Sequence, residues 1–249
     1  MKHLFLKSIF LFAMITWPTL VFAQTKLYAP ILMYHHIEQR TKQNPYIVSP
    51  KIFDEQMAWL KENNFHVVSF ADFYAAAYAT GTLPINPVVI TIDDGHRDQY
   101  TEALPILKKY GYTAMFYVVP GYSDPVHHPH SMTWTMIEDL KKQGMEVGAH
   151  SMTHPNLKHS KMGKVLYEVH ESKKELEAHL GIPVLDFAYP GGDFNSSTVA
   201  VVRAAGFRSA VATWHSVYHT YGMNAYAIPR VHVDNDMASF KKVMQGLQK

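Results

Sequence analysis

Short apolar segments recur along the chain from about residue 30, and a longer amphipathic stretch separates each from the next. Several are unbroken apolar runs, such as Val88-Val89-Ile90-Thr91-Ile92, which are typical of strands buried on both faces of a sheet. The strands predicted in this way are Pro30–His35, His66–Ser69, Val88–Ile92, Ala114–Val119, Glu146–Ala149, Val184–Tyr189, Phe207–Ala212 and Tyr226–Val231.

The stretches between these strands carry apolar residues at helical spacing. Ser49 and Pro50 favour a helix start, and Phe53, Met57 and Leu60 then recur on one face. Four more helices are expected at Glu102–Tyr110, Thr133–Gln143, Lys161–Leu180 and Ser196–Ala205, ended by Gly111, Gly144, Gly181 and Gly206. Strands that alternate with helices, without a linker or repeat after residue 30, predict one α/β domain. Its parallel sheet would form either a barrel or an open sheet.

The first 23 residues are typical of a secretory signal. Lys2 and Lys7 make its start positive, an apolar run follows, and Val21 and Ala23 are the small residues expected before cleavage at Gln24. The apolar run is short for a membrane span, and an uncleaved anchor is the alternative. We therefore predict a signal peptide over residues 1–23, a mature domain over residues 24–249, and export to the periplasm or the medium. No stable membrane span should remain after cleavage.

Composition and charge narrow the functional classes. Removal of Lys2 and Lys7 with the signal peptide leaves 21 basic and 21 acidic residues. A chain without excess positive charge is a poor candidate for binding nucleic acid. Cysteine is absent, which excludes disulfides, thiolate metal ligands and a cysteine nucleophile. Histidine is abundant, with 16 residues, and directs attention to metal binding and acid–base chemistry.

Reactive side chains follow the ends of four predicted strands. In parallel α/β folds the chemistry gathers at the carboxyl ends of the strands, so these segments should meet at one edge of the sheet. An Asp-Asp-Gly sequence alone is also common in turns, so the prediction rests on the combination. The segments are Tyr34-His35-His36, Asp93-Asp94-Gly95, His150–His154 and Pro190-Gly191-Gly192-Asp193.

Two histidine pairs have the spacing His-x-x-x-His and compete for the role of metal ligands. His150 and His154 follow a buried strand, whereas His215 and His219 precede a loop for which the sequence supplies no carboxylate. With Asp94, the first pair makes a set of two histidines and one carboxylate, which leaves coordination positions for water and substrate. Of the two adjacent aspartates, one would bind the metal and its neighbour would take a proton from the bound water.

These segments resemble the motifs of a known family. Thr91-Ile92-Asp93-Asp94-Gly95 is similar to the Thr-Phe-Asp-Asp-Gly motif of the polysaccharide deacetylases, the NodB-homology or carbohydrate esterase family 4 enzymes. The segment Gly148–Leu157 resembles their metal-binding His-Ser/Thr-x-x-His motif. Phe187–Gly192 resembles their third motif in the form found in exported poly-N-acetylglucosamine deacetylases, and Pro30–Ile37 resembles the first strand of that branch. The matches occur in order and cover nearly the whole mature chain.

The resemblance implies a single deformed (β/α) barrel that hydrolyses the N-acetyl group of N-acetylhexosamine units in a cell-envelope or extracellular polysaccharide and releases acetate. It assigns Asp93 as general base. Asp94, His150 and His154 would hold a divalent ion, Zn²⁺ or alternatively Co²⁺, Ni²⁺ or Fe²⁺. The oxyanion would contact the metal and the backbone N–H of Gly191. Poly-N-acetylglucosamine, peptidoglycan and chitin-type polymers all carry the required acetamido group.

Two positions depart from the family pattern. The third motif usually has an arginine two residues before its proline, where this chain has Ala188, and Arg230 is our candidate for the missing charge. The family's Leu-x-x-His motif, which supplies a histidine as general acid, is not recognisable. His232 is the candidate because it lies two residues beyond Arg230 and so on the same strand face. His215 is the second choice, and Trp214 is a candidate wall of the sugar site.

Two other functions compete with deacetylation. Ala188 and the missing acid motif also fit a catalytically weak or inactive sugar-binding protein of the same fold, but a binder would not need both aspartates and both ligand histidines. A non-haem iron oxygenase also uses two histidines and a carboxylate, usually as His-x-Asp/Glu on a jelly-roll strand. Here the aspartate precedes both histidines by more than fifty residues in an α/β chain, which favours the deacetylase.

Overall fold

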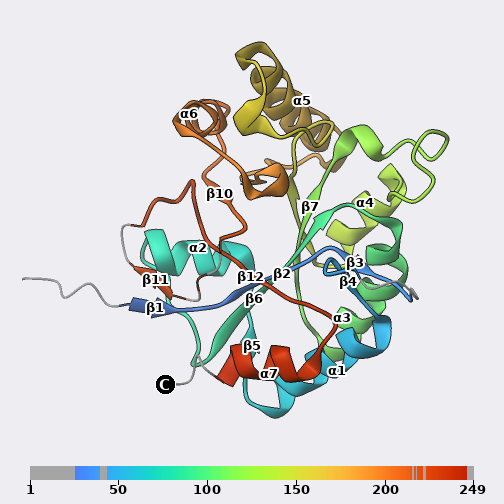
Figure 1. The fold of residues 1–249 in the computed structure, drawn as a ribbon, viewed down its shortest axis with the longest axis vertical. Helices are drawn as coiled ribbons and strands as arrows, with labels where there is room; N and C mark the ends of the chain where they lie inside the picture. The colour runs from blue at the N-terminus through green and yellow to red at the C-terminus, as the bar shows by residue number, and fades with distance from the viewer. Residues whose placement is uncertain (1–25, 40–43, 215, 217, 221–222, 246–249) are drawn as a thin grey trace, which may run out of the picture.

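The computed structural model describes residues 26–39, 44–214, 216, 218–220 and 223–245. Within them a curled parallel sheet is surrounded by helices (Figure 1). The predicted signal peptide and its boundary at residue 24 lie outside the described residues and stay predictions. None of the helices in the described part has the length and apolar character needed to cross a membrane.

Eight strands form the main sheet, and every pairing between them is parallel. They are β2 (Ile31–Tyr34), β5 (His66–Val67), β6 (Pro87–Asp94), β7 (Met115–Val118), β8 (Glu146–Ala149), β9 (Asp186–Ala188), β10 (Ser209–Val211) and β12 (Val231–His232). Across the sheet their order is β10, β9, β8, β7, β6, β2 and β12, and β5 pairs with the first residues of β6. All of their carboxyl ends therefore lie at one edge.

The chain between β10 and β12 closes the curl of the sheet. The backbone N–H of Ala212 donates to the carbonyl of Ile228, and Val211 forms a parallel bridge with the same residue. The next strand, β12, pairs with β2 on the other side of the gap. The predicted strand Tyr226–Val231 is therefore wrong in its bounds, because most of it crosses this gap as irregular chain. The result is the deformed α/β barrel that the resemblance implied.

All five predicted helices are present, and two further helices were not predicted. The helices are α1 (Pro50–Glu62), α2 (Phe70–Tyr78), α3 (Leu104–Tyr110), α4 (Trp134–Lys142), α5 (Met162–Leu180), α6 (Ser196–Ala204) and α7 (Met237–Gln245). A π-helical turn, Gln99–Ala103, precedes α3, and 3₁₀ turns follow at Pro120–Tyr122, Leu157–His159 and Pro190–Gly192. The additional helices are α2 and α7. Helix α2 begins directly after Ser69, which was predicted to end a strand and instead caps the helix.

Side-chain alternation along the strands sorts the core into two parts. Val88 and Ile90 of β6 face outward and pack with residues of α1, α3, α4, α5, α6 and α7. Val89 faces inward and packs with Phe70 and Phe73 of α2, and Figure 1 shows α2 across the sheet from α1, α3 and α4. Since Asp93 is an even number of residues from Val89, the same alternation directs its side chain into the barrel.

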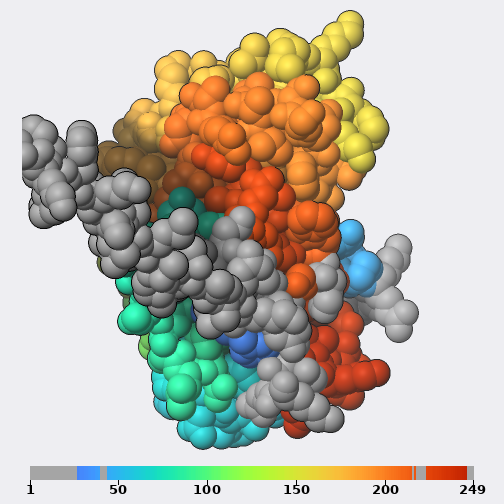
Figure 2. Space-filling model, turned by 90° about the vertical axis from the view of Figure 1, so that its left-hand side faces the viewer, coloured from blue at the N-terminus to red at the C-terminus, as the bar shows by residue number. Residues whose placement is uncertain are grey.

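Four short strands lie outside the main sheet. The pair β1 (Lys26–Tyr28) and β11 (Tyr218–Thr220) is antiparallel, whereas β3 (His36–Ile37) and β4 (Ile47–Val48) are parallel. In the side view of Figure 2, yellow and orange segments form the upper part of the face, and cyan, green and red segments lie in its lower part. Because β3 directly follows β2, it carries His36 to the carboxyl edge of the sheet.

Candidate metal centre

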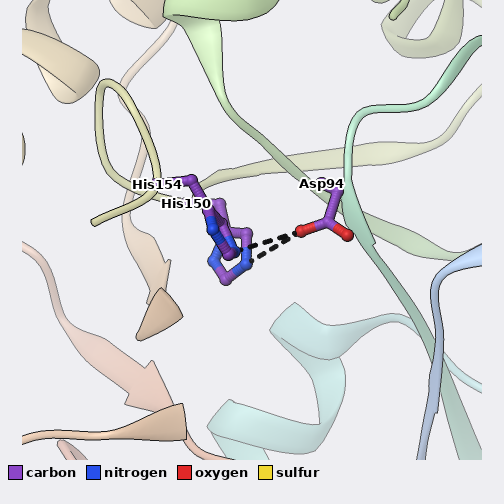
Figure 3. Close-up of side chains that lie close together, drawn as sticks. All are labelled: Asp94, His150 and His154. Carbon is purple, nitrogen blue, oxygen red and sulfur yellow. Dashed lines mark ion pairs between the residues drawn. The ribbon is translucent and has the colours of Figure 1, made fainter. Parts of the chain in front are cut away.

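Asp94, His150 and His154 lie together beyond the carboxyl ends of β6 and β8 (Figure 3). The Nε2 atoms of both histidines are 3.3 Å from Oδ1 of Asp94, and the candidate ligand atoms all lie within 4.8 Å of one another. Oδ1 of Asp94 is buried and accepts no hydrogen bond from the described residues. Two imidazole nitrogens that face such a carboxylate oxygen are a donor set suited to Zn²⁺ and similar ions, so these residues fit the predicted metal.

Left-handed backbone conformations turn these side chains toward one another. Asp94, Ser151 and His154 have φ angles of 80°, 59° and 56°, and each such conformation at a non-glycine residue costs roughly 1–3 kcal/mol. Ser151 offsets part of that cost, because its Oγ accepts a hydrogen bond of 3.0 Å from the backbone N–H of His154. Outside the site, the described non-glycine residues with positive φ are Asn64 and Asn86, and asparagine tolerates this region well. Backbone strain is thus concentrated at the site.

The orientation of the His150 ring is fixed by the strand next to β8. Its Nδ1 lies 2.8 Å from the carbonyl oxygen of Ala188, and because a carbonyl can only accept, Nδ1 must carry the proton. Nε2 is then the nitrogen with a free lone pair on the side of Asp94. Burial lowers the pKa of His150, but the carboxylates of Asp94 and Asp93 outweigh burial and raise it.

Asp93 forms a buried, bidentate ion pair with Arg230. Nη1 and Nη2 of Arg230 donate to Oδ1 and Oδ2 of Asp93 at 2.7 and 2.6 Å, and only 2% of Asp93 and none of Arg230 is exposed. The guanidinium also donates to Thr91 Oγ1 and to the carbonyl of Ala212, both at 3.0 Å. Although burial raises the pKa of Asp93, the charge and hydrogen bonds of Arg230 more than compensate and lower it. The carboxylate is therefore ionised and held in one orientation at neutral pH.

Two further histidines, His96 and His36, lie close to Asp94, the candidate metal ligand. Nε2 of His96 lies 3.2 Å from Oδ2 of Asp94, on the other carboxylate oxygen from the one that faces His150. The His96 ring stacks on His36 with 3.7 Å between centroids, and Nδ1 of His36 is 2.8 Å from Asp98 Oδ2. The position of His96 immediately after Asp-Asp-Gly was the available signal for this contact.

A cavity of about 510 Å³ opens above these residues. Of the residues to which we assigned chemistry, Asp93, Asp94, His150, His154, Gly191 and His232 line it. Arg230 lies beneath Asp93 rather than in the lining, and Gly191 has a φ angle of 64° with open space where a Cβ would project. The other lining residues include Met33, His35, Asn44, Tyr46, Tyr189 and Thr213. The cavity thus brings together the four segments predicted from the sequence, with Thr213 and His232 beside them.

The histidine expected to donate a proton has two described candidates. His232, predicted from its position two residues after Arg230, lines the cavity, and burial lowers its pKa while Asp234 opposes that effect. His35 also lines it, and burial lowers the pKa of His35 to about 4 against the fields of Asp93 and Asp94. The two rings are 6.3 Å apart. His215, the second choice from the sequence, lies outside the described residues.

Other predicted features lie at or beyond the rim of this cavity. Trp214 is 55% exposed and packs edge-on to Phe194 with ring centroids 6.1 Å apart. His219 belongs to β11, whose backbone pairs with β1 rather than with the main sheet. Tyr34 does not line the cavity, because it is buried below it and donates a hydrogen bond of 3.0 Å to Gln56.

Two histidines beside paired aspartates, at the strand ends of a curled parallel α/β sheet, are an arrangement that suits a hydrolytic enzyme. The sequence model of the polysaccharide deacetylases matches residues 80–210, more than half of the chain. The protein therefore belongs to the polysaccharide deacetylase family.

Individual relatives agree with this assignment. YxkH of Bacillus subtilis (strain 168) is 29% identical over 210 residues, which cover 84% of this chain and 72% of YxkH. The poly-β-1,6-N-acetyl-D-glucosamine N-deacetylase of Staphylococcus aureus (strain MRSA252) is 25% identical over 77% of this chain and 69% of its own length. The solved structure of the Streptococcus pyogenes deacetylase PplD in complex with acetate matches with a TM-score of 0.82 and 27% identity, over 91% of this chain and 100% of PplD. IcaB from Ammonifex degensii gives a TM-score of 0.75 and 25% identity over 91% and 99% of the two chains.

These comparisons confirm the predicted family, the predicted fold and the enzyme class, that of a polysaccharide deacetylase. The roles of individual residues stay predictions, as do the identity of the metal, the signal peptide and the export of the protein. The geometry described above is what supports those roles.

Proposed function

We propose that this protein is an exported, metal-dependent deacetylase that hydrolyses the N-acetyl groups of N-acetylhexosamine units in an extracellular or cell-envelope polysaccharide. One observation carries the proposal: the converging ligand atoms of Asp94, His150 and His154 lie in the same cavity as the ionised, arginine-held carboxylate of Asp93. The poly-β-1,6-N-acetyl-D-glucosamine N-deacetylase among the relatives supports poly-N-acetylglucosamine as the first substrate to test.

The proposed division of labour assigns a divalent ion, Zn²⁺ first, to Asp94, His150 and His154. When bound there, such an ion would polarise the acetyl carbonyl and lower the pKa of its water. Asp93, which is ionised and held in one orientation by Arg230, would accept a proton from the attacking water. The backbone N–H of Gly191, at the wall of the cavity, is our candidate donor to the oxyanion.

The proton needed by the departing sugar amine has a defined source in this proposal. Burial lowers the pKa values of both His35 and His232, so neither ring carries a spare proton at neutral pH. The proton that Asp93 takes from the water is therefore the one that reaches the amine, either directly or through one of these rings. We favour His35 for that relay because the charges of both Asp93 and Asp94 act on its pKa. The carboxylate that acts on the pKa of His232 is that of Asp234.

The proposal is tested by acetate release from purified residues 24–249. Metal-loaded and chelator-treated samples of the protein would be compared on poly-N-acetylglucosamine, peptidoglycan and chitin oligomers. Acetate release that needs the metal supports the proposal. Binding of the oligomers without acetate release, in samples shown to hold one equivalent of metal, would instead favour the sugar-binding protein without turnover.

A further inference from the structure

The loop that carries the two histidine ligands is held from the outside by helix α5. Glu168, in the middle of α5, accepts a hydrogen bond of 2.7 Å from the backbone N–H of Thr153 and one of 2.5 Å from its hydroxyl. Only 1% of Glu168 is exposed, and no cationic side chain of the described residues forms an ion pair with it. A glutamate is rarely buried in this way, because removing a carboxylate from water is unfavourable. Here the described hydrogen-bond partners of the buried carboxylate are two donors of one loop residue.

The neighbouring peptide groups of the same loop are also held. The carbonyl of Met152 accepts a hydrogen bond of 3.0 Å from the backbone N–H of Gly121, and the carbonyl of Thr153 accepts one of 3.1 Å from the hydroxyl of Tyr122. A Cβ on Gly121 would lie 2.3 Å from the Met152 oxygen, so this approach requires glycine. The turn after β7 and Glu168 of α5 therefore hold the same loop together.

This clamp acts at the place where the backbone is strained. Ser151 and His154, which flank the clamped residues, both have left-handed φ angles, and a strained conformation persists only where its surroundings over-determine it. Both side-chain oxygens of Glu168 accept from Thr153, so the loop residue is held at two points. Glu168 itself is fixed because Val165, Val169 and Ser172 of α5 are buried with it.

We propose that Glu168 is a positioning residue for the metal centre: through Thr153 it holds the loop in the conformation that brings Nε2 of His154 next to Nε2 of His150. This inference rests on the proposed metal site. It makes α5, which contributes no ligand, a determinant of metal affinity. Outer partners of metal ligands typically contribute about 10–100-fold to affinity.

The experiment measures Zn²⁺ affinity by competition with a chromophoric chelator, well below the unfolding temperature of each metal-free variant. Glu168→Ala removes both hydrogen bonds and should weaken Zn²⁺ binding about 10–100-fold. Glu168→Gln keeps an oxygen that can accept from the backbone N–H of Thr153. Thr153→Val keeps that N–H and removes only the hydroxyl. Each of these two variants should therefore weaken Zn²⁺ binding less than Glu168→Ala does. At saturating Zn²⁺ the kcat of these variants should return toward the wild-type value, because no ligand or proton-transfer group has been changed.

Glu177→Ala is the matched control on the same helix. Its carboxylate accepts a hydrogen bond of 2.9 Å from the backbone N–H of Val184 and pairs with Lys173, away from the metal loop. Zn²⁺ affinity should be unchanged in this variant. An equal loss of affinity in Glu177→Ala would show that helix stability is responsible and would overturn the inference.

Wild-type Zn²⁺ affinity in Glu168→Ala would also overturn it. If that variant does not fold, unchanged affinity in both Glu168→Gln and Thr153→Val has the same consequence. Failure of the proposed function looks different, because the wild-type protein itself would then bind no Zn²⁺ at this site.

Discussion

Replacement of Arg230 by alanine is the most direct test of how the general base is maintained. Arg230 is fully buried, and its bidentate pair with Asp93 has N···O distances of 2.7 and 2.6 Å. In Arg230→Ala the carboxylate would stay in a barrel interior from which water is largely excluded. It would also lose the cation that keeps its pKa below the ordinary value against the opposing effect of burial.

The magnitude follows from the burial of both partners. Removal of one partner of a buried ion pair typically costs about 3–5 kcal/mol, and about 1.4 kcal/mol corresponds to a change of one in a pKa. Protonation of Asp93 is the cheaper way to relieve an unpaired charge, so its pKa should rise by about two or more. A protonated Asp93 cannot accept a proton from water, and the acidic limb of the pH–rate profile should move upward by a similar amount.

Stability should respond to pH in the corresponding direction. Because the folded-state pKa of Asp93 is lowered, the wild-type pair stabilises the fold above the unfolded-state pKa, and this contribution is lost as the pH falls through the folded-state value. In Arg230→Ala the effect of burial, which raises that pKa, would be opposed by the smaller effects of His150 and His35, so acidification should no longer remove stability at this group. Thermal unfolding of both proteins from about pH 8 down to about pH 2 would measure the difference, because the wild-type loss falls below the ordinary pKa of an aspartate.

The assay is acetate release as a function of pH at saturating metal, together with metal content, which should not change because no ligand is touched. Ala188→Arg in the Arg230→Ala background would restore the arrangement that the family motif usually has, and should recover part of the rate. A variant with lower thermal stability but an unchanged pH–rate profile would refute the reasoning. Arg230 would then be a residue that merely closes the barrel.

The remaining predictions separate the other roles. Asp93→Asn should keep its metal and lose about 10²–10⁴ in turnover; normal turnover would remove Asp93 from the mechanism. Asp94→Ala should lose both the bound metal and acetate release, whereas His219→Ala should keep both, and the opposite result would reverse our choice of histidine pair. His35→Gln should reduce kcat more than His232→Gln at equal metal content, and a larger effect at His232 would return the relay to the residue predicted from sequence.

The sequence by itself determined the class of fold and the place of the chemistry. Unbroken apolar runs such as residues 88–92 predict parallel strands, and parallel strands must gather their carboxyl ends at one edge. The pairing of Asp94 with His150 and His154 could therefore be predicted although more than fifty residues separate them. The spacing of His150 and His154 is local, and the strands that place this pair and Asp94 can be predicted from the periodicity of apolar residues.

Helix α2 shows where periodicity was not sufficient. Ser69 was predicted to end a strand, but its hydroxyl instead accepts from the N–H of Asp72 and caps α2. The apolar residues of that helix look alike in sequence whether they face a sheet from outside or fill a barrel from inside. Only the closed sheet decides that Phe70 and Phe73 fill the inner core.

Contacts between distant segments were decided by the tertiary structure. Arg230 reaches Asp93 across 137 positions of sequence because irregular chain, rather than the predicted strand, crosses the gap between β10 and β12. Arg230 was selected from the sequence because it lies near the end of the last predicted strand, but its contact with Asp93 could not be derived from that position. Glu168 had no signal at all, since an acidic residue on an amphipathic helix usually faces water. The spacing of apolar residues can be read from each segment of the sequence by itself. The partner of a buried charge depends on how the barrel closes, and the closure of the barrel depends on the whole chain.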